Sequence, residues 1–142
     1  MTDDIPPIED LLPHRGPMRL IDRVVAWEPD RVACRAVVRP DNPFLRDGRL
    51  EAVAHMELIA QAAAAHITLA DPLRRPIRGY LVAARDLVLA REAEVLLGTT
   101  LEVFVQEVAR LGAFASYEGR VTLGDQVMAQ GNVKVYRRED EP

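Results

Sequence analysis

The stretch AVAHMELIAQAAAAHITL, residues 52–69, decides the fold. It is apolar on nearly every helical face, contains no Gly or Pro that would break a helix, and carries one charged side chain, Glu57. A helix that is apolar all round is buried, whereas a surface helix keeps one charged face. We therefore expect a buried helix that begins near Leu50. A buried carboxylate needs a partner or a raised pKa, so Glu57 is a candidate for acid–base chemistry.

Strand-like segments flank this helix on both sides. Before it, residues 18–27 and the alternating residues 31–39 predict an antiparallel hairpin around the turn at 28–30. After it, breaks that contain Gly separate segments rich in strand-forming residues. Four strands are predicted there, at residues 79–90, 99–109, 113–123 and 126–136.

The remaining segments connect these elements within one predicted domain that spans residues 1–142. Residues 8–12 predict one helical turn that stops at a proline, and residues 1–7 predict a frayed tail. Residues 40–48 and 71–76 are rich in Pro, Asp and Arg and predict loops. A domain of this length is large enough to bury a core.

The order of two strands, one helix and four strands indicates an α+β fold. A helix that is apolar all round needs partners on every side, and one strongly curved antiparallel sheet wrapped around it would supply them. Such a sheet leaves unpaired edge strands and an open face on the helix. A dimer that joins two sheets is therefore expected.

Composition narrows the classes of function. The net charge of −4 argues against nucleic acid as a partner. The acidic N-terminus lacks the features of a signal peptide, and polar residues within residues 52–69 argue against a membrane span, so a soluble, cytoplasmic protein is expected. Cys34, the only cysteine, lies in an alternating run and is expected to be a core residue. Three dispersed His residues match no metal-binding pattern.

Two motifs carry a resemblance to a known family. Residues 12–24 read LPHRGPMRLIDRV, and residues 57–62 read ELIAQA at the expected place on the helix. With the Asn42-Pro43-Phe44 run and the closing strands, these motifs resemble the 3-hydroxyacyl-acyl-carrier-protein dehydratases of fatty-acid synthesis, which have the hot-dog fold. The resemblance covers nearly the whole chain and implies the same curved sheet around one central helix.

The sequence departs from that family in one loop. In the family, the helix Glu acts across the dimer interface with a His from a Gly-His-Phe-Pro-Gly loop. Here the loop before the helix is shorter, reads LRDGRLEAV over residues 45–53, and has no His. The short loop and the opening motif look closer to a divergent, dehydratase-like branch associated with aryl-polyene biosynthesis.

The resemblance implies roles for several residues. Glu57 would be the acid–base group, with Gln61 one turn later as its orienting neighbour. Ala52 and Val53, at the start of the helix, match the place where backbone N–H groups meet the thioester carbonyl. The substrate would arrive on the phosphopantetheine of an acyl carrier protein, with no other cofactor and no metal.

Which residue replaces the loop His is open at this stage. His14 belongs to the opening motif, where the family's His is usually structural, and His55 could reach a partner subunit's site if it faces the interface. His66 lies far along the helix and is expected in the core or an interface. Asp41 and Asn42 lie near the position of the lost loop, where either could position a water.

Three functions compete on this fold. The first is a dehydratase that acts on carrier-bound 3-hydroxyacyl chains. The second is a thioesterase, in which Glu57 would activate water. The third is a non-catalytic subunit that pairs with an active hot-dog protein, so the dimer could be a homodimer or a heterodimer. Arg74, Arg75 and Arg78 form the densest basic cluster, which is either a solvated loop or a contact for an acidic carrier protein.

Overall fold

A single antiparallel sheet of six strands forms the body of the protein. The computed structural model describes residues 5–73, 78–90 and 94–138, with only the backbone at 78–80 and 138. The strands follow the spatial order β1-β2-β6-β7-β8-β5, and every neighbouring pair is antiparallel. They are β1 (Arg23–Glu28), β2 (Arg31–Val37), β5 (Arg78–Leu89), β6 (Thr100–Leu111), β7 (Phe114–Leu123) and β8 (Gln126–Arg138).

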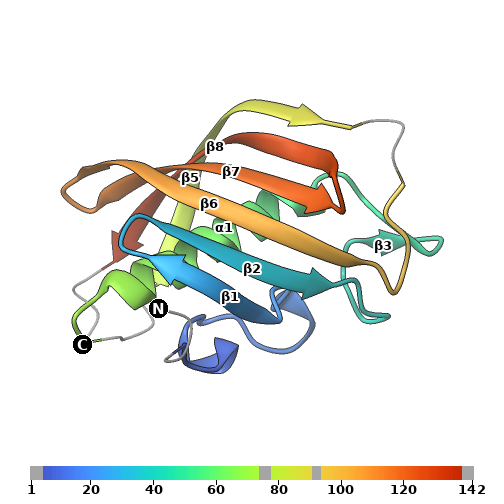
Figure 1. Cartoon of the computed structure of the whole chain (residues 1–142), viewed down its shortest axis with the longest axis horizontal. Coiled ribbons are helices and arrows are strands. Elements are labelled where there is room, and N and C mark those ends of the chain that lie inside the picture. Colours follow the sequence, from blue (N-terminus) through green and yellow to red (C-terminus); the bar gives the residue numbers. More distant parts are fainter. Residues whose placement is uncertain (1–4, 74–77, 91–93, 139–142) are drawn as a thin grey trace.

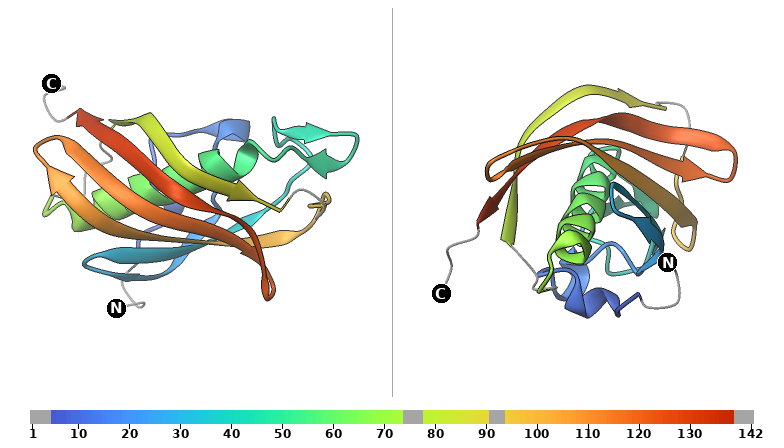
Figure 2. Two further views of the ribbon diagram at one scale, coloured as in Figure 1. Left: turned by 90° about the horizontal axis from the view of Figure 1, so that it is seen from above. Right: turned by 60° about the vertical axis from the view of Figure 1, so that its left-hand side comes forward.

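The sheet curves around one helix, α1 (Ala54–Ala70), which lies along its concave face (Figures 1 and 2). Burial alternates along β2 and along most of β7, so that every second side chain faces the helix and the others face outward. The predicted curved sheet around a central helix is therefore confirmed. The helix begins at Ala54 and not near Leu50, because Leu50 pairs with Leu45 in a short hairpin.

The opening motif covers the side of the helix that the sheet leaves open. Together with the residues just before it, it forms two short 3-10 turns, η1 (Ile8–Asp10) and η2 (Gly16–Met18), which run beneath the helix in the right-hand view of Figure 2. The Thr68 hydroxyl donates to the Leu11 carbonyl at 2.9 Å and ties this segment to the end of the helix. The helical turn predicted at residues 8–12 is confirmed by η1.

One hairpin falls where a loop was expected. Strands β3 (Leu45–Arg46) and β4 (Arg49–Leu50) pair around a two-residue turn just before the helix. Asp47 and Gly48 both have positive φ, 55° and 77°, which is the conformation of a type I′ turn. Asp-Gly between strands is a strong hairpin signal, so the sequence contained this element and the loop prediction for residues 40–48 was wrong in part.

Gly119, in the middle of β7, allows the helix to approach the sheet closely. A Cβ at this position would lie 2.5 Å from Cγ2 of Ile59, which is fully buried on the facing side of α1. Real atoms do not approach so closely, so any larger residue must displace Ile59 or push the helix away. This glycine thus sets the spacing between helix and sheet beside the turn of helix that carries Glu57.

We expect Gly119→Ala to lower the free energy of unfolding by about 1–3 kcal/mol, the usual cost of overpacking a core. Urea unfolding measures this, with Ser116→Ala on the same strand as the control. The double variant Gly119→Ala/Ile59→Ala should lose less unfolding free energy than the two single variants lose in sum. The reason is that the methyl added at position 119 then fills space vacated by Ile59. Strictly additive losses would show that Gly119 and Ile59 do not constrain each other.

Candidate active site

Glu57 lies in the first turn of α1, beside the opening motif. Its side chain is 28% exposed, so the expectation of a carboxylate buried in the core is wrong. The reason is that the sheet covers one side of the helix only, and the opening motif closes the other side incompletely at Met56, Glu57 and Ala60. Glu57 is therefore accessible to solvent, and so to a substrate.

Gln61 fixes the position of Glu57. It is fully buried, and its Nε2 group donates to Glu57 Oε1 at 3.0 Å and to the Met18 carbonyl at 2.7 Å. Its Oε1 atom accepts the N–H of Leu20 at 2.9 Å and that of Ile21 at 3.4 Å. One amide thus joins helix, opening motif and carboxylate, as expected of residues one helical turn apart.

His14, from the opening motif, faces the same carboxylate. Its Nε2 lies 3.7 Å from Glu57 Oε1, and its side chain is 27% exposed. Its Nδ1 is buried and has no hydrogen-bond partner in the described part of the chain. Burial lowers the pKa of His14; Glu57 opposes this shift and Arg15 adds to it.

The loop that carries His14 is held by the neighbouring guanidinium group. Arg15 donates to the carbonyls of Leu12 and His14, at 2.5 and 2.8 Å, and to that of Glu9 at 3.0 Å. These bonds fix a short non-helical segment that has no strand partner. They explain why His14 has a defined place beside Glu57 although no regular element supports it.

The start of the helix provides exposed backbone donors near this carboxylate. Val53 is the N-cap residue, and no side chain caps the helix. The N–H groups of Ala54, His55 and Met56 bond to carbonyls three residues earlier. Among the described residues no group accepts a hydrogen bond from the N–H of Ala52 or Val53, and both residues are exposed. They can donate to an incoming carbonyl oxygen.

Other predicted site residues do not meet Glu57. His55 is buried, burial lowers its pKa, and no contact with Glu57 is described, as expected for residues two apart on a helix. The Asn42 side chain accepts the N–H of Phe44 at 2.8 Å and so shapes its own turn. Asp41 faces the Arg39 guanidinium at 3.8 Å. In the described part of the chain, no contact joins the Asn42 or Asp41 side chain to the Glu57 carboxylate.

His66 forms a buried network that was not expected from the sequence. Its Nε2 faces the Pro29 carbonyl at 2.8 Å, so this nitrogen carries the proton, and its Nδ1 lies 2.7 Å from the Tyr117 hydroxyl. Tyr117 is fully buried, and its hydroxyl also lies 3.3 Å from Glu107. The core role expected for His66 is confirmed. No local sequence signal links it to Tyr117, fifty-one residues away.

This network predicts a loss of stability at acid pH. Burial lowers the pKa of His66, so the neutral ring contributes its full stability above about pH 6.5, the ordinary value, and loses it as pH falls below that. For every tenfold difference in the acid dissociation constant of His66 between the folded and unfolded chain, the free energy of unfolding changes by about 1.4 kcal/mol. Urea unfolding at about pH 7.5 and 5.5 should show a smaller loss for His66→Gln than for the wild type. Equal losses would contradict the prediction.

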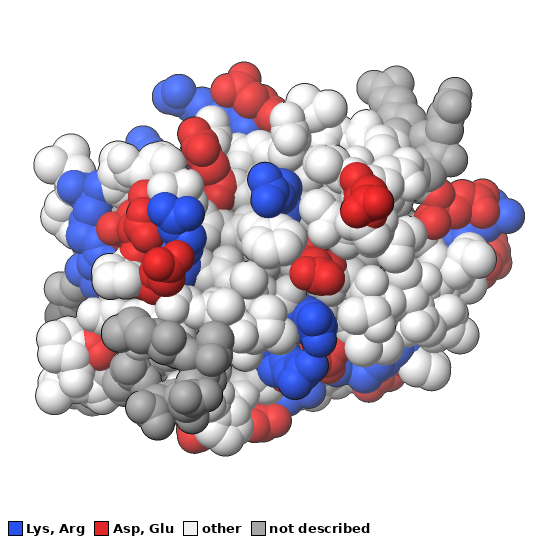
Figure 3. All heavy atoms as spheres, viewed as in Figure 1, with Lys and Arg blue, Asp and Glu red and all other residues white. Residues whose placement is uncertain are grey.

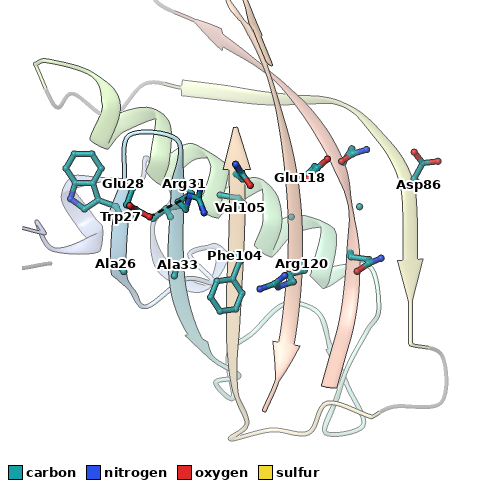
Figure 4. A pocket seen from close by; sticks show the side chains of 16 residues that line it. Ala26, Trp27, Glu28, Arg31, Ala33, Asp86, Phe104, Val105, Glu118 and Arg120 are labelled. Atoms are coloured by element: carbon teal, nitrogen blue, oxygen red, sulfur yellow. Dashed lines mark ion pairs between the residues drawn. The ribbon is translucent and has the colours of Figure 1, made fainter. Parts of the chain in front are cut away.

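A hollow lies on the face of the sheet opposite the helix. It has a volume of about 650 Å³ and lies across the outer side of the six-stranded sheet, from β1 to Asp86 on β5 (Figure 4). The Arg120 guanidinium lies 4.9 Å from the centroid of the Phe104 ring within it. Acidic and basic groups are interspersed over this face (Figure 3), so it offers no single-sign docking surface. The sheet separates it from Glu57.

The described residues hold neither a cluster of metal ligands nor a membrane-spanning helix. No cluster of three His, Cys, Asp or Glu side chains that could hold a metal ion occurs among them. None of the helices described is long and apolar enough to cross a membrane. Cys34 is buried, and burial raises the pKa of its thiol to about 12, which confirms its expected core role. Arg74, Arg75 and the side chain of Arg78 lie outside the described part of the chain.

The ApeP-like dehydratase model, described as ApeP dehydratase, matches residues 6–142. The chain belongs to this family. The ApeP-like chain is also 33% identical, over 135 residues, to the 3-hydroxyacyl-acyl-carrier-protein dehydratase FabZ of Anaeromyxobacter sp. (strain K), a match that covers 89% of this chain and 85% of the relative. The resemblance seen in the opening motif and the helix is therefore confirmed.

Solved structures confirm the fold of the ApeP-like chain. The dehydratase heterocomplex ApeI:P from Xenorhabdus doucetiae matches with a TM-score of 0.84 and 24% identity, over 95% of this chain and 93% of that one. Zebra fish thioesterase superfamily member 2 matches with a TM-score of 0.64 and 16% identity, over 92% and 91%. At these identities both show the hot-dog fold alone, and the family match distinguishes a dehydratase from a thioesterase.

Proposed function

We propose that this ApeP-like protein removes water from a 3-hydroxyacyl thioester carried on the phosphopantetheine of an acyl carrier protein, and that Glu57 is its acid–base residue. The observation that carries the proposal is the solvent-accessible Glu57 carboxylate, held by Gln61 beside an uncapped helix start. A FabZ relative of known substrate class supports the choice of thioester.

The geometry suits such an elimination in two ways. Negative charge develops on the thioester oxygen when the proton at C2 is removed, and fixed N–H donors stabilise that charge best. The exposed N–H groups of Ala52 and Val53 provide such donors at the start of the same helix. The carboxylate one turn further along then lies on the side of the helix where a bound acyl chain would present C2 and C3.

We further propose that the protein works as a dimer with a second hot-dog subunit, joined along β5. In the described part of the chain β5 pairs only with β8, so its other edge is open. It exposes Leu81, Val82 and Val88, and such an edge pairs readily with another strand. The heteromeric assembly of the ApeI:P relative supports a partner that is a different hot-dog protein.

The test is turnover of a series of 3-hydroxyacyl-carrier-protein thioesters, followed by mass spectrometry. The protein is assayed alone and after co-expression and co-purification with a second hot-dog dehydratase subunit. Loss of 18 mass units, roughly one water, supports dehydration, and activity that requires the second subunit supports the heterodimer. Release of a free acid would indicate a thioesterase, and no reaction in either arrangement would overturn the proposal.

A further inference from the structure

We propose that His14 is the catalytic hydrogen-bond donor to the departing hydroxyl, within the same subunit as Glu57, and that Glu57 alone carries the proton. The inference rests on the proposed dehydration and identifies a hydrogen-bond donor that this chain itself places beside Glu57. The two carboxylate oxygens of Glu57 have different surroundings. Oε1 accepts from Gln61 and faces His14, whereas no partner is described for Oε2.

The surroundings of His14 determine which ring nitrogen carries the proton. A proton on Nδ1 would be a buried donor without an acceptor, because that atom has no partner in the described residues. Leaving a buried donor unpaired costs about 1–3 kcal/mol. Nε2 faces the carboxylate instead, so the neutral ring carries its proton there. Burial lowers the pKa of His14, which keeps the ring neutral near pH 7.

The spacing of the two groups leaves room for a shared oxygen. Nε2 and Oε1 are 3.7 Å apart, too far for a good direct hydrogen bond. An oxygen atom about 2.8 Å from each can lie between them, as a donor to Glu57 and an acceptor from His14. The 3-hydroxyl of a substrate fits this description. Both groups are partly exposed, so the place is open to solvent and substrate.

The reaction then balances with one proton carrier. Glu57 Oε2 takes the proton from C2, and the electrons of that C–H bond form the C2–C3 double bond. The C3–O bond breaks, and its electron pair leaves on the hydroxyl oxygen, which the Nε2–H of His14 stabilises. Glu57 transfers its proton to that oxygen, which departs as water, and the carboxylate is regenerated. His14 keeps its own proton throughout.

This role is tested by two substitutions at one position. Gln places an amide N–H near the position of His Nε2 but cannot titrate, whereas Ala removes the donor. Loss of a hydrogen-bond donor to a developing charge lowers kcat about 10²–10³-fold, so His14→Ala should lose that much while His14→Gln stays within about tenfold of the wild type. His55→Gln, a buried His on α1 away from Glu57, is the matched control.

The pH profile separates this role from acid–base catalysis by His14. If His14 only donates a hydrogen bond and keeps its proton during the reaction, the plot of kcat/KM against pH should have the same shape for the wild type and His14→Gln. The inference would be overturned if His14→Gln were as inactive as His14→Ala and its kcat/KM profile lost a limb in the imidazole pH range. Full activity of His14→Ala would also overturn it. Thermal unfolding of each variant checks that it is folded. Full activity of Glu57→Gln would instead overturn the proposed function.

Discussion

Replacing Glu57 by Gln is expected to lower kcat/KM for dehydration about 10²–10⁴-fold, the range that a positioned acid–base group contributes. The amide has nearly the same shape and can still lie beside Gln61, but it cannot accept the C2 proton. The fold should be unaffected, because the Glu57 side chain is partly exposed and forms no buried ion pair. Steady-state turnover of a carrier-bound 3-hydroxyacyl thioester measures the effect.

Glu51→Gln is the matched control for this substitution. Glu51 is a partly exposed carboxylate six residues earlier, and its described ion pair is with Arg46 at 3.5 Å. Glu51 lies just before the same helix, and its substitution changes the local charge by the same amount. This control therefore reports any general effect of removing an acidic group. Water loss that persists in Glu57→Gln, at the rate of the control, would contradict the role assigned to Glu57.

The second large effect is expected at Gln61. Substitution by Leu keeps the size of the side chain but removes every hydrogen bond that the amide makes to Met18, Leu20 and Glu57. Each polar group left unpaired where water cannot reach it costs roughly 1–3 kcal/mol, so the variant should unfold at clearly lower urea concentration. Activity should fall as well, because the carboxylate loses the donor that orients it.

Two comparisons sharpen this experiment. Gln130→Leu changes an exposed amide on the outer face of β8 and should leave stability nearly unchanged. Gln61→Glu keeps an acceptor for the Leu20 N–H but loses the donor and places a second carboxylate beside Glu57. If the Glu variant retained wild-type stability and activity, the amide donor would have no part in holding the site.

The element order followed from hydrophobic pattern, and the pattern explains both the successes and the errors. The apolar run at 52–69 required a surrounding sheet, and the breaks around Gly112 and Gly124 placed the hairpins between the last three strands. The helix begins four residues later than the sequence predicts, because Leu50 pairs with Leu45 around the Asp47-Gly48 turn. The Asp-Gly turn signal lies within these residues, but the hydrophobic pattern alone does not reveal it.

The site was predictable to the extent that it lies on one helix. Glu57 and Gln61 share a face by periodicity alone, so their contact follows from their spacing. The approach of His14 does not, because forty-three residues separate it from Glu57 and the loop that carries it has no regular structure. The same holds for the His66–Tyr117 pair, which forms only when β7 crosses the helix. Contacts across such distances depend on the whole fold.

The order of the elements along the chain affects how the protein is made. During synthesis α1 leaves the ribosome before β5, β6, β7 and β8, the strands that cover much of its apolar surface. Strand β2 likewise has no pairing partner on one edge until β6 is synthesised, since Arg31 pairs with Gln106. Pairings between such distant residues form slowly, and apolar surface that waits for them promotes aggregation. We expect nascent chains that end before β6 to require chaperones, while completed chains bury the helix and do not.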